Sequence, residues 1–184
     1  MTERQDPDLP LLRAMASGDT SACAELYARH GRSILAYLIG QLSGDQKLAE
    51  EVLQDVMLAA WQGATKFRGE SKVKTWLLAI ARLKALNARR RKRPTAAELH
   101  ENIAGDAPTP QHVIERYATR LSVREAIREL PDDQRETLEL IFYHDLTGAE
   151  AAGLLGVAVG TVKSRLHRAK NTLRGILQRK EVEE

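Results

Sequence analysis

The stretch TGAEAAGLLGVAVGTVKSRLHRAK, residues 147–170, carries the signals that decide the fold. It opens with Thr147 and Glu150 at the spacing of a capping box, in which each side chain accepts a hydrogen bond from the other residue's backbone N–H. A short helix is therefore predicted to begin here. It should end near Gly156, because glycine tolerates the left-handed backbone of a tight turn.

The same stretch has the spacing of a helix-turn-helix. Ala152 and Gly156 lie four residues apart, and Val162 follows six residues later. In such a motif a small residue lets two helices approach, a glycine makes the turn and a branched side chain fills the crossing. We therefore predict a second helix after the turn, with Val162 on its packing face.

This second helix is basic on its outer face, because residues 151–180 contain seven Lys and Arg and no Asp or Glu. Such a helix offers hydrogen-bond donors to phosphates and to base edges in a DNA major groove. The polar positions are Lys163, Ser164, His167, Lys170 and Arg174. Most basic runs are only solvated faces, and this alternative stays open. The capping box, the Ala-Gly-Val spacing and the missing acids favour DNA.

The composition is typical of an intracellular, helix-rich globular protein. The 184 residues are 43% hydrophobic, 29% charged and 4% aromatic, with a net charge of +3, and they suffice for two small domains. Cys23 is the only cysteine, so an intrachain disulfide is excluded and a small buried side chain is expected. No stretch approaches the roughly 18 to 20 apolar residues of a membrane span, and a cytoplasmic location is predicted.

No motif predicts an enzyme, a metal site or a cofactor. The chain has no glycine-rich phosphate loop ending in Gly-Lys-Ser or Gly-Lys-Thr. His100 and Glu101 are not followed by a second His at the metalloprotease spacing, and no cluster of His, Cys and acids has ligand spacing. Catalysis by this chain is therefore not expected.

The spacing of apolar residues is helical throughout, so the predicted fold is all-α. In residues 48–61 two apolar rows recur at every fourth position and form one broad stripe. The opposite face carries Glu51, Gln54, Asp55 and Leu58. Helices predicted over residues 9–16, 22–42 and 74–91 complete a four-helix unit.

A basic block and a linker separate this unit from the second half. Residues 89–93 are all Lys or Arg, and residues 95–112 contain prolines, a glycine, three acids and no Lys or Arg, which is a flexible linker composition. Helical spacing returns in a helix that ends before Pro131, and in another over about 132–144. The second of these should turn Leu138, Ile141 and Phe142 inward. The predicted domains are residues 1–94 and 113–184, joined by the linker 95–112.

Four stretches resemble the extracytoplasmic-function (ECF) class of the sigma-70 family, bacterial sigma factors that give RNA polymerase its promoter specificity. They are AEEVLQDVMLAAW (49–61), FRGESKVKTWLLAIAR (67–82), LPDDQRETLEL (130–140) and GTVKSRLHRAK (160–170). They occur in the family's order and separation. The resemblance implies sigma region 2 in residues 1–94 and sigma region 4 in residues 113–184.

The resemblance also implies a docking face for core RNA polymerase. In the family the polar face of the second conserved helix binds the clamp coiled coil of the largest polymerase subunit, and the flap is a further contact. The matching positions here are Glu51, Gln54 and Asp55. The alternative is a plain solvated face. Acidic groups that meet a basic coiled coil would mainly set the rate and orientation of docking.

The following stretch resembles the reader of the promoter's minus-ten element. A flipped base is stacked and hydrogen-bonded only after it has left the duplex, and the family forms the pocket for it in the loop 67–72. The implied DNA-binding residues are Phe67, Arg68, Lys72, Lys74 and Trp76. Phe67 and Trp76 could instead be core aromatics. Three positions depart from the common pattern: Leu77 replaces a second tryptophan of housekeeping factors, Ala79 a basic residue and Leu83 an asparagine.

For the minus-thirty-five element the resemblance implies contacts from the second helix of the helix-turn-helix. These are Thr161, Lys163, Ser164, Arg165, His167, Arg168 and Lys170, with Arg165 either on a phosphate or in an intramolecular pair. Ala158 stands where the family more often has Pro or Ser, which weakens the predicted cap. The basic block would contact the upstream duplex backbone through Arg89, Arg90, Arg91, Lys92 and Arg93.

The predicted partners are core RNA polymerase, promoter DNA and an anti-sigma factor, since family members are commonly sequestered by such inhibitors. Two other functions stay open. A helix-turn-helix regulator that is not a polymerase subunit would leave residues 67–82 unexplained. A sigma-like decoy that binds an anti-sigma factor without reaching DNA would leave the basic helix unexplained.

Overall fold

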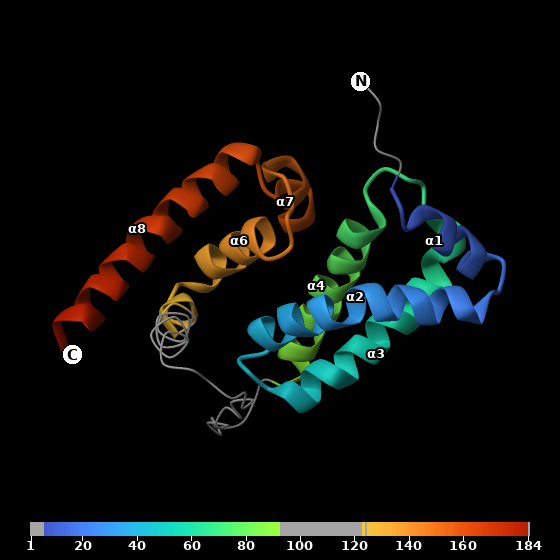
Figure 1. Cartoon of the computed structure of the whole chain (residues 1–184), viewed down its shortest axis with the longest axis horizontal. Helices are drawn as coiled ribbons and strands as arrows, with labels where there is room; N and C mark the ends of the chain where they lie inside the picture. The colour runs from blue at the N-terminus through green and yellow to red at the C-terminus, as the bar shows by residue number, and fades with distance from the viewer. Residues whose placement is uncertain (1–5, 93–122, 124, 184) are drawn as a thin grey trace, which may run out of the picture. The chain divides into compact units, whose positions relative to one another are not determined.

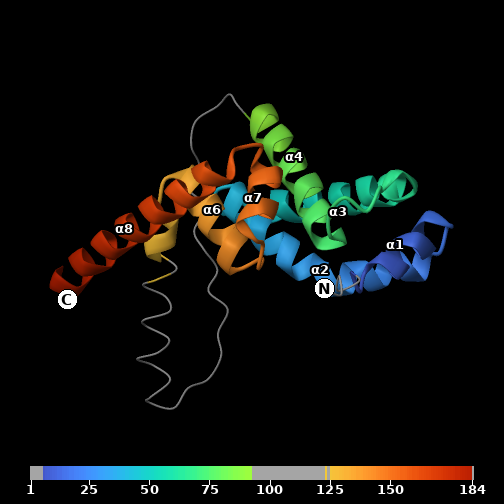
Figure 2. The same cartoon turned by 90° about the horizontal axis from the view of Figure 1, so that it is seen from above.

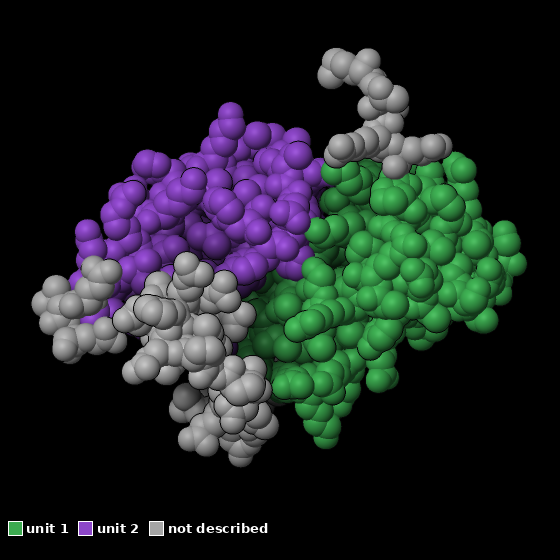
Figure 3. All heavy atoms as spheres, in the orientation of Figure 1, with its two compact units in different colours: residues 1–100 green, residues 101–184 purple. Residues whose placement is uncertain are grey.

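The computed structural model describes residues 6–92, 123 and 125–183, and within these ranges it contains helices and no strands (Figure 1). The chain divides into two compact units, Met1–His100 and Glu101–Glu184 (Figure 3). The boundaries predicted near residues 94 and 112, and the linker between them, lie outside the described residues. The part of the helix predicted before Pro131 that precedes residue 123 also lies outside the described residues.

In its described residues, 6–92, unit 1 has four α-helices and one short 3₁₀ turn. The elements are α1 (Leu9–Ala16), α2 (Thr20–Gln41), α3 (Gln46–Gly63), η1 (Ala64–Lys66) and α4 (Val73–Lys92). The long helices α2, α3 and α4 pack against one another, and α1 packs on α2 and on η1 (Figure 2). The predicted helices over 9–16, 48–61 and 74–91 are thus confirmed.

Local caps explain where the helices of unit 1 begin. The Asp19 carboxylate accepts from the Ser21 N–H at 2.8 Å and starts α2, and the Asp45 carboxylate accepts from the Leu48 N–H at 2.9 Å and starts α3. A side chain of this kind satisfies N–H groups that have no partner within the helix. Gly18 precedes the first cap at φ +92°, a conformation that favours glycine.

The core of unit 1 takes side chains from all four α-helices. Fully buried members are Leu12, Leu26, Leu38, Val56, Leu77 and Leu78. Burying each leucine contributes about 1.5–3 kcal/mol relative to leaving it exposed. Because the apolar stripe of α3 is used for this packing, its polar positions are left on the surface.

Unit 2 contains α6 (Asp132–Phe142), α7 (Gly148–Leu155) and α8 (Val159–Glu183). Residues 125–128 are also helical, and α6 and α7 both pack on α8. The buried cluster consists of Ala126, Ile127, Leu130, Leu138, Ala169 and Ile176. The far end of α8 packs on this cluster through Ile176. It is also held by Lys180, whose Nζ lies 3.3 Å from Glu125 Oε2 and 3.0 Å from Glu129 Oε1.

The helix-turn-helix is formed by α7 and α8 as predicted. Glu150 N–H donates to Thr147 Oγ1 at 3.2 Å, and Thr147 N–H donates to Glu150 Oε2 at 2.7 Å. Gly156 caps α7 at φ +68°, and both Ala152 and Val162 are buried. The capping box, the left-handed turn and the two packing residues are therefore confirmed.

One inward assignment is wrong. The Phe142 side chain is 54% exposed, and α6 ends at this residue instead of near residue 144. Beyond the helix the chain turns, and Asp145 has a φ of +54°. In this turn the side chains of His144 and Leu146 are buried, and that of Phe142 is not. The Phe142 ring lies instead under Lys170, whose Nζ is 5.5 Å from the ring centroid.

Candidate nucleic-acid interface

The predicted docking residues lie together on the outer face of α3. Glu51, Gln54 and Asp55 are all exposed, whereas Val52, Leu53 and Val56 on the other side of the helix are buried. Leu58 continues the exposed face and is 57% exposed. The face therefore combines two carboxylates, an amide and an apolar side chain, a mixture suited to a partner with both cations and apolar groups.

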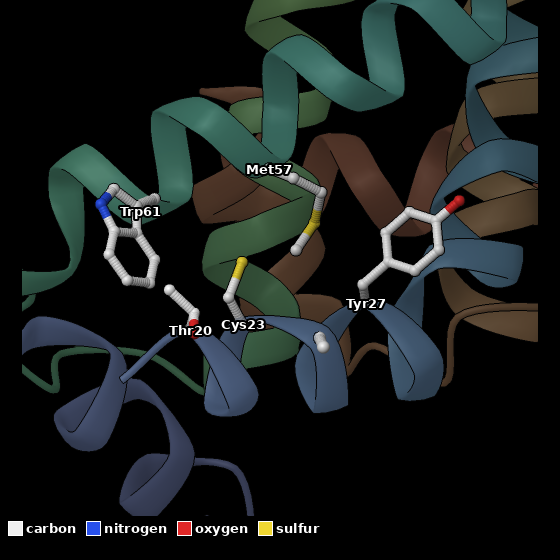
Figure 4. Close-up of a pocket in the computed structure, with 6 residues that line it drawn as sticks. Thr20, Cys23, Tyr27, Met57 and Trp61 are labelled. Carbon is white, nitrogen blue, oxygen red and sulfur yellow. The ribbon is translucent and has the colours of Figure 1, made fainter. Parts of the chain in front are cut away.

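A shallow cavity of about 440 Å³ lies beside this helix, between α2 and α3 (Figure 4). Its lining comes from Thr20, Cys23, Ala24, Tyr27, Met57 and Trp61. Figure 4 shows the sulfur atoms of Cys23 and Met57 between the rings of Trp61 and Tyr27. Cys23 is therefore only partly buried, and the expectation of a buried side chain is wrong. The residue lies where the α2–α3 contact opens toward solvent.

The loop 67–72 presents its charged side chains to solvent. Arg68 and Lys72 are exposed, and Arg68 Nη1 lies 3.8 Å from Glu70 Oε1 in a fully solvated pair. An exposed pair of this kind contributes little to stability, so the guanidinium can exchange its partner for a phosphate. Lys74, on the first turn of α4, is half-buried.

The two aromatic residues predicted for minus-ten recognition contact each other. The ring centroids of Phe67 and Trp76 are 5.2 Å apart, at 60° between the ring planes. Both side chains are half-buried, and Trp76 lies so close to the end of α3 that a Cβ on Gly63 would be 3.2 Å from the indole. The pair therefore fixes the start of the loop and keeps an exposed edge.

One face of α4 continues from Trp76 along the helix. Ala79, Leu83, Asn87 and Arg90 follow at helical spacing and are exposed, with Leu83 60% exposed. Leu77, where housekeeping factors carry a second tryptophan, is fully buried instead. Of the basic block, Arg89, Arg90 and Arg91 are exposed; the Lys92 side chain and Arg93 lie outside the described residues.

The predicted minus-thirty-five residues occupy the first turns of α8. Lys163, Ser164, His167, Arg168 and Lys170 are exposed, and Thr161 is half-buried. The Ser164 hydroxyl donates to the Thr161 carbonyl at 2.9 Å, and His167 Nε2 lies 3.1 Å from Asn171 Nδ2. These local contacts hold the side chains against the helix without covering them. Ala158, which precedes α8, provides no side-chain oxygen for a cap.

Arg165 differs from its neighbours because it already has an acidic partner. Its Nε lies 3.3 Å from Asp133 Oδ2 on α6, and its side chain is only 23% exposed. Of the two roles considered, the structure shows the intramolecular pair. Sequence reasoning missed Asp133, because no local pattern indicates which acid of α6 faces α8.

Neither a metal site nor a membrane helix is found in the parts of the chain that the structure describes. No group of three His, Cys, Asp or Glu side chains among them could hold a metal ion. No helix there is both long enough and apolar enough to cross a bilayer.

Comparison with protein-family models gives one match in each unit. Residues 26–95 match sigma-70 region 2, and residues 120–173 match sigma-70 region 4. Together these segments cover more than half of the chain. The chain belongs to the sigma-70 family. Its two-unit, all-α fold is thus that of regions 2 and 4, as predicted.

Similar proteins place this sigma factor in the ECF class. It is 35% identical to the ECF RNA polymerase sigma factor SigM of Mycobacterium tuberculosis, over 95% of this chain and 86% of that protein. It is 33% identical to the ECF RNA polymerase sigma factor RpoE of Cereibacter sphaeroides, over 95% of this chain and 98% of that protein. The predicted class is therefore confirmed.

Two solved structures share the fold. CnrH, solved in complex with the cytosolic domain of CnrY, matches the sigma factor with a TM-score of 0.67 and 25% identity, over 93% of this chain and 97% of that one. RpoE of Bartonella quintana, solved in complex with the anti-sigma factor NepR, matches with a TM-score of 0.65 and 26% identity. The match covers 84% of this chain and 96% of that one.

Proposed function

We propose that this sigma factor binds core RNA polymerase and directs promoter-specific transcription initiation. The observation that carries the proposal is that the polar faces of α3 and α8 and the charged loop 67–72 are all exposed, while the apolar faces of the same helices are buried. One surface is acidic and the other two are cationic. They therefore suit a protein partner and DNA, respectively.

The first step is docking of α3 on the polymerase. Glu51, Gln54 and Asp55 would meet the clamp coiled coil of the largest subunit, with the flap as a second contact. Opposite charges across the contact steer the encounter and fix its orientation, so these residues set the association rate above all. Leu58 continues the same face and would add an apolar contact.

The second step is recognition of the minus-ten element by the loop 67–72 and α4. Arg68, Lys72 and Lys74 would neutralise phosphates of the melted strand, whose splayed bases are then open to stacking and hydrogen bonding. The rings of Phe67 and Trp76, which contact each other, would form the surface against which the upstream edge of the melted region rests. Arg89, Arg90, Arg91, Lys92 and Arg93 would bind the backbone of the duplex further upstream.

The third step is recognition of the minus-thirty-five element by α8. A recognition helix lies in the major groove with its N-terminal residues on base edges. Lys163, Ser164 and His167 are exposed on these turns, and Thr161, Arg168 and Lys170 would contact the flanking phosphates. Lys163 is the candidate for guanine, because lysine donates to its O6 and N7 acceptors.

The sigma factor would work in the cytoplasm, without a cofactor and without catalysing a reaction itself. An anti-sigma factor would control it, because the Bartonella quintana RpoE with the same fold was solved bound to one. Such an inhibitor would have to cover at least one of the three exposed surfaces.

The purified chain, mixed with core RNA polymerase, tests the proposal. We expect promoter-specific initiation from a subset of genomic fragments and none from core alone. A chain that binds duplex DNA tightly but confers no initiation would instead be a helix-turn-helix regulator. A chain that neither binds DNA nor confers initiation would be a decoy for an anti-sigma factor.

A further inference from the structure

The first turn of α4 is capped by a residue from the start of the chain. Asp6 Oδ2 accepts a hydrogen bond from the Val73 N–H at 2.5 Å, and Val73 is the first residue of α4. The first N–H groups of a helix have no partner within it. Lys72, which precedes the helix, has only donors in its side chain and cannot act as the cap. A carboxylate 67 residues away supplies the missing acceptor.

Asp6 is itself fixed by a chain of hydrogen bonds that leads to α2. Its Oδ1 accepts from the Asp8 N–H at 3.0 Å. The Asp8 side chain is buried; its Oδ1 accepts from Arg29 Nη1 at 3.0 Å, and its Oδ2 lies 2.7 Å from His30 Nε2. Both oxygens of each carboxylate are therefore engaged, and α2 holds the segment that caps α4.

The loop 67–72 is consequently anchored at both ends and exposed between them. At its start Phe67 packs on Trp76, and at its end the Val73 N–H is held by Asp6. Between these anchors Arg68 and Lys72 are exposed, and Gly69 has a φ of +75°. The two anchors set the position of the very segment that would receive a flipped base.

We propose that Asp6 is a positioning residue for minus-ten recognition. The inference rests on the proposed function, because it assigns the loop to the minus-ten element. Asp6 would touch no DNA. It would hold the end of the loop so that its backbone and cations meet the melted strand in one geometry, since a binding site must be held to within about 0.5 Å to discriminate.

Hydrogen exchange of the full chain tests the anchor directly. The variants are Asp6→Ala and Asp19→Ala; the second removes a carboxylate cap of the same kind from α2. Loss of such a cap should raise local exchange about fivefold. We expect this rise over residues 67–76 for Asp6→Ala, and only at the start of α2 for Asp19→Ala. Unchanged exchange at Val73 in Asp6→Ala would overturn the proposal.

Promoter discrimination by the holoenzyme tests the consequence. We compare initiation from a promoter selected by the wild-type holoenzyme with initiation from single-base variants of its minus-ten and minus-thirty-five elements. Asp6→Ala should reduce minus-ten discrimination about fivefold, the factor expected for one lost cap. Core affinity and minus-thirty-five discrimination should stay unchanged. Asp6→Asn keeps an acceptor oxygen, so this variant should retain most of the wild-type discrimination at the minus-ten element.

Two results would overturn the positioning role. Equal losses of discrimination in Asp6→Ala and Asp19→Ala would show a general destabilisation of unit 1 instead of a local one. Failure of the wild-type holoenzyme to initiate at any promoter would overturn the proposed function and the role of Asp6 in promoter reading together. The exchange experiment separates failure of the proposed function from failure of the anchor, because it measures the Asp6–Val73 contact without polymerase or DNA.

Discussion

Arg165 of α8 forms an ion pair with Asp133 of α6, with 3.3 Å between Nε and Oδ2. The pair joins the proposed recognition helix to the helix behind it, and Asp133 is 45% exposed. Because exposed ion pairs contribute about 0–1 kcal/mol, DNA phosphates can compete with Asp133 for this guanidinium. The acid therefore restrains a cation beside the proposed DNA surface.

The first prediction concerns this restraint. Asp133→Ala frees Arg165 and should raise the affinity of the chain for non-specific duplex DNA severalfold, with a salt slope steeper by about one unit in a plot of log K against log salt. Fluorescence anisotropy across a range of salt concentrations measures both quantities. Glu125→Ala makes the same charge change at the far end of α8, where Glu125 pairs with Lys180. Equal effects of the two substitutions would contradict a specific role for Asp133.

Lys163 should read a base pair of the minus-thirty-five element. Lys163→Ala is expected to lower discrimination at one position by about 1–3 kcal/mol, because the exposed ammonium group can donate to guanine edges. Competition binding of the holoenzyme to promoters with each base substituted measures this loss. Arg179→Ala is the control, since it removes one positive charge from the exposed far end of the same helix. An unaltered base preference in Lys163→Ala would remove this residue from the reading set.

The outer face of α3 should decide the affinity for core polymerase. Gln54→Ala combined with Asp55→Ala is expected to weaken core binding by roughly threefold or more, mainly through slower association at low salt. Surface plasmon resonance with immobilised core polymerase measures the rates, and duplex DNA affinity should not change. Glu25→Ala alters an exposed acid on α2 and should leave the rates as they are. Normal association of the double variant would argue against this docking face.

We expect Gly156 to be required because of its backbone conformation, and not because a side chain would lack space. A Cβ added there would meet no atom within 4 Å, but the residue has a φ of +68°. Gly156→Ala should therefore cost about 1–2 kcal/mol of unfolding free energy. Gly153, three residues earlier within α7, has equal space and an ordinary helical conformation. Gly153→Ala should stabilise the protein by about 0.5–1 kcal/mol in urea denaturation. The opposite order of stabilities would contradict the assignment of this turn.

Glu139 should make the stability of unit 2 dependent on pH. Burial raises the pKa of this side chain from 4.5 to about 7, and its Oε2 has no hydrogen-bond partner within the described residues. Below pH 4.5 the carboxyl is protonated in both states and has no effect. As the pH rises toward 7 the unfolded chain ionises first, so the free energy of unfolding falls by about 1.4 kcal/mol per unit of pKa difference.

Glu139→Gln removes this titration. In urea denaturation followed by circular dichroism, the variant should match the wild type at pH 4 and exceed its stability at pH 8, by about 1–3 kcal/mol. Glu51→Gln, which removes an exposed carboxylate, is the control for a charge change that alters no buried group. A constant offset between Glu139→Gln and the wild type at all pH values would contradict the prediction.

The sequence predicted the helices well because their signals are local. The capping box at Thr147 and Glu150, the turn at Gly156 and the apolar stripe of α3 each depend on residues within one or two turns of helix. The same stripe placed Glu51, Gln54 and Asp55 on the surface, since a helix that buries one side must expose the other. The charged positions of α8 follow from the same reasoning.

What the sequence did not predict depends on residues that are distant in the chain. The Asp6 cap of α4 and the Asp133–Arg165 pair join different elements, and no spacing rule indicates such contacts. Phe142 was expected inside because its neighbours in the helix are apolar, but α6 ends there and the chain turns away. Cys23 is small enough for a core, yet the opening between α2 and α3 leaves it partly exposed.

Because α8 is long, a small change in its direction at one end produces a large displacement at the other end. At a rise of 1.5 Å per residue, Lys180 lies about 25 Å along the helix from Lys163. Its Nζ is held there by Glu125 and Glu129. A tilt of about 8° at that end would move the opposite tip by about 3.4 Å, the length of one base-pair step. If α8 reads a promoter as proposed, its register on the DNA would depend in part on two carboxylates at the opposite end of the helix.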